Sequence, residues 1–363
     1  MKNRLESAQI FARLAALREA GVPAALATVV RVRGSAYRRE GAKLLVAEDG
    51  STVGNVSGGC LEADVREVAL RVLETRRPEL RAYCSGSDEV AAWDLGVGCE
   101  GEVEVWTEPA AGVLAGEMER IAGEDPFAVC TLLAEAGETG PARRLLVTAT
   151  DSAGGLGDAV LDAAAAGRAR ERLGEGRSGI QEVEGEPVFI DLYDAPPLLL
   201  LVGAGEDARP LARLALEVGF RVAVVDRRPA LLAPDRFPEG VRLVRCHPSG
   251  LEGRVELGER CHAVVMSHHY EDDLEYLRTL VRAPLPYLGV LGPRQRTDRI
   301  LRALAEDGPI DESRVYGPVG LDIGTEGAEQ VALSIVAEIL AVRSGRAAGS
   351  LRERVRPIHA LAL

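Results

Sequence analysis

Aromatic residues and long apolar runs are both scarce in this sequence of 363 residues. Aromatic side chains make up 4% of the chain, too few for the stacking platforms that bind single-stranded nucleic acid. The net charge of -13 is also unfavourable for contact with a phosphate backbone, so we expect no nucleic-acid partner. No uninterrupted apolar stretch approaches the roughly 20 residues that span a bilayer, so we expect no membrane partner.

We also expect neither a secretory signal nor a metal-binding cysteine pattern. Residues 1–4 lead directly into an amphipathic pattern instead of an apolar segment, which predicts a cytoplasmic protein. The six cysteines, at 60, 84, 99, 130, 246 and 261, form neither a C-x-x-C pair nor a disulfide-like framework. This spacing argues against a zinc ribbon and favours a reducing compartment with one or two functional thiols.

The length and composition predict two domains, each with its own core. Hydrophobic residues make up 47% of the chain and charged residues 27%, as in soluble globular proteins. Pro196 and Pro197 interrupt any regular structure just before a new apolar run, so we place the boundary there. We predict an α/β protein: an N-terminal mixed α+β domain over 1–195, a C-terminal Rossmann-like doubly wound parallel-sheet domain over 196–345, and a surface tail over 346–363.

Strand and helix patterns alternate in the N-terminal domain. Apolar runs predict strands at 24–30, 43–47, 80–84, 102–106, 127–133, 145–148 and 188–193. Helical spacing of apolar residues predicts helices at 7–20, 61–73 and 158–166, the last within a region rich in glycine, alanine and arginine.

The most informative motif is Ser57-Gly58-Gly59-Cys60, which delivers a cysteine to the expected first turn of the helix at 61–73. The partial positive charge of a helix N-terminus favours the thiolate, and the two glycines leave the sulfur open to approach. A second glycine-flanked cysteine occurs at Cys99. The alternative interpretation is a small apolar residue that closes a strand-to-helix turn.

A nucleotide-binding fingerprint occurs far downstream. The apolar run 198–202 is followed at once by Gly203 and Gly205, then by a helical pattern, and a second strand ends at Asp226. The order of strand, glycine turn, helix and acidic residue predicts a Rossmann βαβ unit in which Asp226 accepts hydrogen bonds from a ribose. Glu206 and Asp207 place two carboxylates where a pyrophosphate would lie, so a scaffold kept only for packing is the alternative.

Two later loops carry further candidate ligand contacts. Strands predicted at 263–266 and 287–291 end in loops that hold His268 and Arg294, at the sheet edge where such folds bind ligands. His268 is a candidate polar contact or proton donor with Asp273 as its orienting partner, and Arg294 is a candidate phosphate ligand. The alternative for both is a structural or solvated side chain.

Together these residues resemble the XdhC/CoxI family, accessory factors of xanthine dehydrogenase and related molybdenum hydroxylases. The resemblance covers most of the chain and rests on several motifs in the family's order. In the N-terminal half these are residues 25–30, 34–39, 41–43 and 57–62. In the C-terminal half they are the Gly203/Gly205 turn with Pro210, His268 with Asp273, residues 289–294 and residues 317–324.

The resemblance implies a chaperone that binds molybdenum cofactor, protects it during sulfuration and inserts it into xanthine dehydrogenase or a related hydroxylase, without net turnover of its own. Cys60, with Cys99, is then the soft thiolate contact to the metal, while Arg38, Lys43 and the backbone of Ser57, Gly58 and Gly59 hold the phosphate. A cysteine desulfurase is an expected partner, and we expect a homo-oligomer that shields the labile ligand.

An NAD(P)-dependent oxidoreductase is the alternative function. In that interpretation the C-terminal domain binds NAD(P) and His268 acts as a general acid. A dehydrogenase, however, does not explain a glycine-flanked cysteine in the other domain. A combination also stays open, in which NAD(P) or another nucleotide, or the nucleotide half of a dinucleotide cofactor, occupies the Rossmann cleft.

Overall fold

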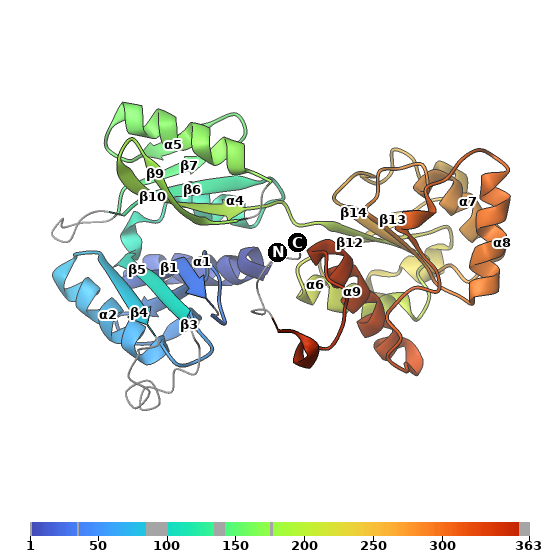
Figure 1. Cartoon of the computed structure of the whole chain (residues 1–363), viewed down its shortest axis with the longest axis horizontal. Helices are drawn as coiled ribbons and strands as arrows, with labels where there is room; N and C mark the ends of the chain where they lie inside the picture. Colours follow the sequence, from blue (N-terminus) through green and yellow to red (C-terminus); the bar gives the residue numbers. More distant parts are fainter. Residues whose placement is uncertain (1, 35, 85–100, 134–141, 175–176, 356–363) are drawn as a thin grey trace. The chain divides into compact units, whose positions relative to one another are not determined.

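The structure is a computed structural model that describes residues 2–34, 36–84, 101–133, 142–174 and 177–355 (Figure 1). The chain forms two compact units, Lys2–Ala195 and Pro196–Val355. The first contains two antiparallel sheets with helices and the second a parallel sheet between helices, which confirms the predicted α/β fold class. Cys99, one of the two candidate cysteines, lies outside the described residues.

The N-terminal unit contains two five-stranded antiparallel sheets. The first has the order β3-β2-β1-β5-β4, with strands β1 (Ala24–Gly34), β2 (Lys43–Ala47), β3 (Thr52–Gly54), β4 (Glu79–Cys84) and β5 (Gly101–Pro109). The second has the order β8-β7-β6-β10-β9, with strands β6 (Phe127–Leu132), β7 (Arg144–Val147), β8 (Ser152–Gly155), β9 (Gly179–Val183) and β10 (Glu186–Tyr193).

Helices cover the sheets of this unit because each sheet has an apolar side to bury. Helix α2 (Glu62–Thr75) packs on one side of the first sheet through Val65, Val68 and Val72. The side chains of α1 (Lys2–Glu19) share a core with both sheets, and α5 (Ala159–Arg172) covers the far side of the second sheet. The short helix α4 (Ala115–Ile121) follows β5.

The C-terminal unit is built on a six-stranded parallel sheet with the order β13-β12-β11-β14-β15-β16. Its strands are β11 (Leu198–Val202), β12 (Arg221–Asp226), β13 (Val241–Arg245), β14 (Cys261–Val265), β15 (Tyr287–Val290) and β16 (Val315–Tyr316). This is the Rossmann strand order, in which the direction of winding reverses between β11 and β14. Ligands bind such sheets outside the carboxyl ends of the strands at that reversal.

Helices cover both sides of the parallel sheet. Helices α6 (Ala208–Glu217) and α9 (Gly327–Ser344) pack on one side, and α7 (Tyr270–Leu280) and α8 (Arg294–Ala305) on the other. Strand β11 is apolar throughout because alternate leucines enter both cores. Among the described residues, no helix combines the length and apolar character needed to cross a membrane.

The sequence prediction differs from the structure mainly in glycine-rich and polar segments. The strands predicted at 43–47 and 198–202 have the observed bounds. The sequence does not predict the edge strands Ser152–Gly155 and Gly179–Val183, because neither carries an apolar run. Both pair at the edges of the second sheet, where backbone hydrogen bonds rather than side-chain burial define the strand.

Candidate functional site

The cysteine motif forms a tight turn organised by the side chain of Ser57. This hydroxyl is buried, accepts hydrogen bonds from the N–H groups of Gly59 (3.1 Å) and Leu61 (3.0 Å), and donates to the carboxylate of Glu62. Glu62 in turn accepts the N–H of Ser57 at 2.9 Å. The turn therefore closes before the helix, which begins at Glu62, and Cys60 precedes the first helical turn instead of lying within it.

The carboxylate of Glu62 is held in its charged form by the same turn. Partial burial raises its pKa, but hydrogen bonds from the hydroxyl and N–H of Ser57 and from the N–H of Val56 outweigh this, so the pKa of Glu62 lies below its usual value. A fixed negative charge thus lies next to the cysteine turn.

The thiol of Cys60 is exposed, and one aromatic side chain lies beside its turn. A Cβ atom at Gly58 would lie 3.4 Å from the ring of Tyr37, whose side chain is 65% exposed. Gly59 has a φ of 112°, a conformation that L side chains rarely adopt. The two glycines therefore leave an open surface that a flat, polar ligand could share with Tyr37 and Cys60.

Two of the basic residues expected to bind phosphate, Arg38 and Lys43, are buried in ion pairs. Arg38 pairs with Glu6, and its guanidinium is almost fully covered. Lys43 lies between the two sheets, where its ammonium donates to Asp191 and to the carbonyl oxygen of Gly41. A phosphate that bound either side chain would have to displace a carboxylate.

In the C-terminal unit, the loops after β11 and β14 meet at the winding reversal. A Cβ atom at Gly203, where φ is 118°, would lie 2.5 Å from the carbonyl oxygen of Met266, so only glycine permits this contact. The N–H of Ala204 donates to Asp226 at the end of β12, at 2.9 Å. The glycine turn, Asp226 and the His268 loop are therefore brought together as the sequence predicts.

His268 lies in the loop after β14, beside the glycine turn that follows β11. We call the region between these two loops the crevice. The Nε2 atom of His268 donates to Oδ2 of Asp207, at 3.0 Å, and its ring would touch a methyl group placed on Gly205. Its φ of 61° is in the left-handed region, which is costly for a residue with a side chain. Asp207, and not Asp273 as predicted from the sequence, is the partner of His268.

The carboxylate of Asp226 already accepts four hydrogen bonds. Besides the N–H of Ala204, it accepts the N–H (2.8 Å), Nε (2.9 Å) and Nη2 (2.8 Å) of Arg228. Burial raises the pKa of Asp226, but these bonds outweigh it and hold the pKa below its usual value. A ribose hydroxyl would have to displace Arg228 in order to reach this carboxylate.

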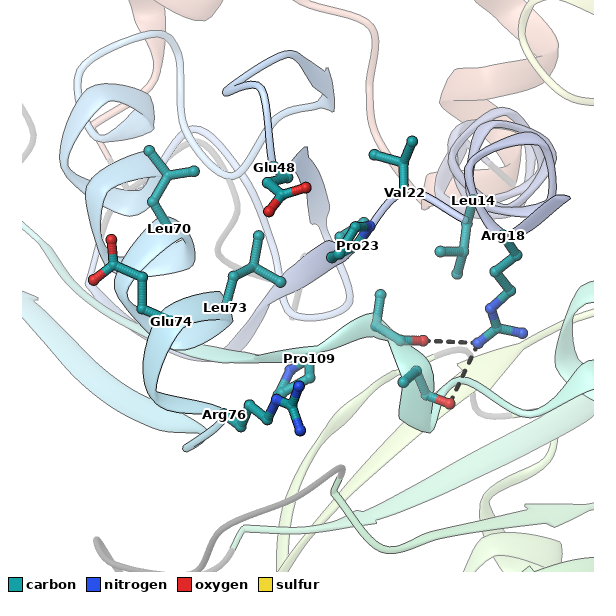
Figure 2. A pocket seen from close by; sticks show the side chains of 13 residues that line it. Leu14, Arg18, Val22, Pro23, Glu48, Leu70, Leu73, Glu74, Arg76 and Pro109 are labelled. Atoms are coloured by element: carbon teal, nitrogen blue, oxygen red, sulfur yellow. Dashed lines mark hydrogen bonds between the residues drawn. The ribbon is translucent and has the colours of Figure 1, made fainter. Parts of the chain in front are cut away.

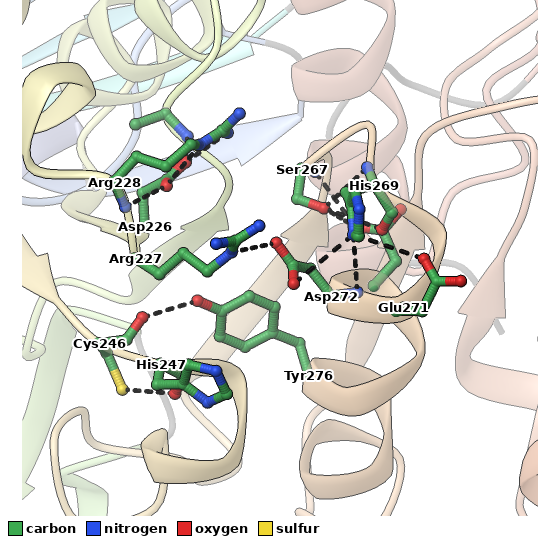
Figure 3. A network of polar contacts seen from close by, with 12 residues as sticks. Asp226, Arg227, Arg228, Cys246, His247, Ser267, His269, Glu271, Asp272 and Tyr276 are labelled. Atoms are coloured by element: carbon green, nitrogen blue, oxygen red, sulfur yellow. Dashed lines mark hydrogen bonds and ion pairs between the residues drawn. The ribbon is translucent and has the colours of Figure 1, made fainter.

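A network of polar contacts lies between the end of β12 and the start of α7 (Figure 3). Arg227 donates to Asp272 at 2.7 Å, and the N–H of Asp272 donates to His269 at 3.4 Å. The hydroxyl of Tyr276 donates to the carbonyl oxygen of Cys246 at 3.0 Å. These contacts join β12 and β13 to α7 beside the crevice.

Arg294 begins α8 and its side chain is exposed, whereas Arg296, two residues later, is half-buried. Arg296 pairs with Asp273, whose carboxylate is fully buried and also accepts the hydroxyl of Ser267. Burial raises the pKa of Asp273, and the bonds from Ser267 and Arg296 act against this rise without cancelling it. Nothing in the sequence distinguishes Arg296 from its exposed neighbour.

A separate pocket of about 970 Å³ lies on the N-terminal unit (Figure 2). It is bounded by Leu14 and Arg18 of α1, by Leu70 and Leu73 of α2 and by Pro109. The guanidinium of Arg18 donates to the carbonyl oxygens of residues 110 and 113 at the pocket wall. The pocket wall includes none of the predicted cofactor-binding residues.

Within the described part of the chain, no three His, Cys, Asp or Glu side chains converge as ligands for a metal ion.

Family models match both units: the XdhC and CoxI family over residues 17–83, and the XdhC Rossmann domain over residues 199–339. A Bacillus subtilis protein that is named as a probable xanthine dehydrogenase component is 33% identical over 332 residues, which are 91% of this chain and 96% of that protein. An Escherichia coli protein named molybdenum cofactor insertion chaperone PaoD is 25% identical, covering 89% of this chain and 84% of that protein. A crystal structure described as a xanthine dehydrogenase from Bacillus halodurans aligns with a TM-score of 0.74 at 30% identity, covering 94% of this chain and 98% of the other.

Proposed function

Because the chain belongs to the XdhC and CoxI family, we propose that it is an accessory chaperone for molybdenum enzymes. Its role is to bind molybdenum cofactor, protect it during sulfuration and insert it into xanthine dehydrogenase or a related molybdenum hydroxylase. The observation that carries this proposal is the likeness, along most of both chains, to a protein named molybdenum cofactor insertion chaperone. No net turnover is needed for such a role.

Cys60 is the proposed contact to the metal of the cargo. Molybdenum in this cofactor is held by soft sulfur ligands of the pterin, so the protein need supply only one further soft ligand. An exposed thiol on an open glycine turn meets that need, and Ser57 and Glu62 fix the turn without covering the sulfur. Cys99 is a second proposed contact.

The phosphate of the cofactor is proposed to bind close to the same turn. The backbone of Gly58 and Gly59 offers an approach without side chains. Arg38 is the proposed source of positive charge, and its guanidinium would have to leave Glu6 in order to bind the phosphate. Lys43 is the weaker candidate, because its ammonium lies between the sheets and is paired with Asp191.

The proposed partners follow from the cargo. Sulfuration requires a source of sulfane sulfur, for which a cysteine desulfurase is the proposed donor, and the recipient is an apo-hydroxylase. The proposed place of action is the cytoplasm, where thiols such as Cys60 stay reduced.

The test is isothermal titration of the reduced protein with anaerobically prepared molybdenum cofactor. We expect saturable binding by the parent, loss of binding in Cys60→Ala and no recovery in Cys60→Ser, which keeps the size but not the soft sulfur. Ser51→Ala, an exposed position in a nearby turn, is the matched control and should bind as the parent does. A parent protein that binds no cofactor contradicts the proposed function. Full binding by Cys60→Ala contradicts only the role of the thiol.

A second candidate, an NAD(P)-dependent oxidoreductase, is favoured by the Rossmann strand order and by the glycine turn at Gly203. The same titration with NAD and NADP tests it, with Asp226→Ala as the variant. Saturable binding that Asp226→Ala weakens, without any response to molybdenum cofactor in the parent, would favour the oxidoreductase. Binding of both ligands would favour a nucleotide, or the nucleotide half of a dinucleotide cofactor, in the Rossmann cleft.

A further inference from the structure

An exposed aromatic ring and an exposed thiol lie at the same place in the N-terminal unit. Among the described residues, Tyr37 is the one aromatic side chain that is largely exposed, at 65%. It lies between β1 and β2, against the turn that carries Cys60. Cys60 is exposed as well, whereas Cys130, Cys246 and Cys261 are buried, as cysteines usually are.

The residues on either side of Tyr37 fix its position. Ala36 is buried in the core beneath α2, which Leu61 of the cysteine turn also enters. Arg38 is buried in its ion pair with Glu6. Because both neighbours of Tyr37 are anchored inside the unit, the ring is held at the surface before any ligand arrives, and little conformational freedom is lost when a ligand binds to it.

One face of the Tyr37 ring lies against the glycine turn. A Cβ atom on Gly58 would be 3.4 Å from Cγ of the ring and 3.7 Å from each of Cδ1 and Cδ2. Similar distances to these three adjacent carbons place that position over the ring face and not beyond its edge. Since Gly58 lies on this face, the opposite face is the one that is open to solvent.

We propose that the open face of Tyr37 stacks on the pterin ring of molybdenum cofactor. This inference rests on the proposed function, which supplies the cargo. The pterin is a flat, polar heterocycle, and such rings stack on tyrosine while their polar edges stay in water. Because Tyr37 lies against the turn that carries Cys60, a single ligand can contact both the ring and the thiol.

The test is isothermal titration of the reduced full chain with anaerobically prepared molybdenum cofactor that carries no second nucleotide, so that the pterin is the flat ring available for stacking. We expect Tyr37→Ala to raise the dissociation constant about ten- to a hundredfold, which is the usual effect of losing one stacked heterocycle. Tyr37→Phe keeps the aromatic face and should bind within about twofold of the parent. Tyr37→Leu keeps apolar bulk without a flat face and should bind as weakly as Tyr37→Ala.

Val160→Ala is the matched control. Val160 is also 65% exposed but lies on α5, so this variant should bind as the parent does. A thermal melt checks the folding of each variant, and Tyr37→Leu decides the question if Tyr37→Ala is unfolded.

The outcomes separate this inference from the proposed function. A parent protein that binds no cofactor contradicts the proposed function itself. If the parent binds, parent-like affinity in Tyr37→Ala or in Tyr37→Leu overturns the stacking alone. A loss of affinity in Tyr37→Ala that occurs only with cofactor carrying a second nucleotide also overturns it, because the nucleobase would then be the stacked ring.

Discussion

The imidazole of His268 donates to the carboxylate of Asp207 across the crevice of the Rossmann sheet, with 3.0 Å between Nε2 and Oδ2. Asp207 precedes α6, where the fold would hold the phosphate of a nucleotide. The pair therefore places both a negative charge and a bulky ring at that position. Any phosphate that binds there must displace His268 and tolerate Asp207.

We predict that Asp207→Asn strengthens the binding of phosphate-bearing ligands to the crevice by about five- to tenfold, because it removes a like charge near the phosphate. Titration with NAD and NADP measures this change. Glu217→Gln, the same loss of charge at the other end of α6, should have little effect. An equal gain in both variants would mean that net charge, and not the position of Asp207, controls binding.

The βαβ unit could be predicted because its signals are local. The apolar run 198–202, the glycine turn and Asp226 follow one another in sequence, and each appears where the pattern indicates. The partners of these residues could not be predicted, because they come from distant segments of the chain. Asp207 and His268, for example, form a hydrogen bond although they are 61 positions apart in the sequence. The ion pair of Lys43 could not be predicted for the same reason, because its partner Asp191 lies 148 positions away on the other sheet.

The Lys43–Asp191 pair predicts a large stability effect. Lys43→Met leaves the carboxylate of Asp191 buried without its cation, so the free energy of unfolding should fall by about 3–5 kcal/mol. Adding Asp191→Leu should recover most of this loss, because the unpaired charge is then gone. Urea denaturation followed by circular dichroism measures both values. A loss below about 1 kcal/mol in Lys43→Met would contradict a structural role for the pair.

The same double variant separates structure from binding. If it folds and binds molybdenum cofactor with the parent's affinity, Lys43 is not a phosphate ligand. If it folds and loses affinity, the ammonium of Lys43 leaves Asp191 when the cofactor binds.

Cysteine reactivity should differ sharply among the described thiols. Burial raises the pKa of Cys130 and of Cys261 to about 12 each, so almost none of either thiol is ionised at pH 8, whereas Cys60 is exposed. We expect iodoacetamide to modify Cys60 at least about a hundredfold faster than the other two. Peptide mass spectrometry over time measures the rates, and in urea the three should react alike. Comparable rates for Cys60 and Cys130 in the folded protein would contradict the open turn.

The buried imidazole of His262 predicts a loss of stability in mild acid. Burial, followed by the charge of Arg343, lowers the pKa of His262 to about 4, from an ordinary value of 6.5. Between pH 6.5 and about pH 4, the imidazole of His262 is therefore protonated in the unfolded chain but mostly neutral in the folded chain. The resulting destabilisation is absent above pH 6.5, grows as the pH falls toward 4 and levels off below it, and amounts to roughly 2–4 kcal/mol.

His262→Phe, which keeps an aromatic ring beside Phe220 and Tyr287, should remove this part of the pH dependence. Its stability at pH 8 should stay within about 1.5 kcal/mol of the parent's, because the ring is replaced by one of similar size. Urea denaturation of both proteins from pH 8 to pH 4 measures the free energy of unfolding, and the parent should lose stability relative to the variant as acid is added. Parallel curves would mean that His262 is protonated as easily in the fold as in the unfolded chain.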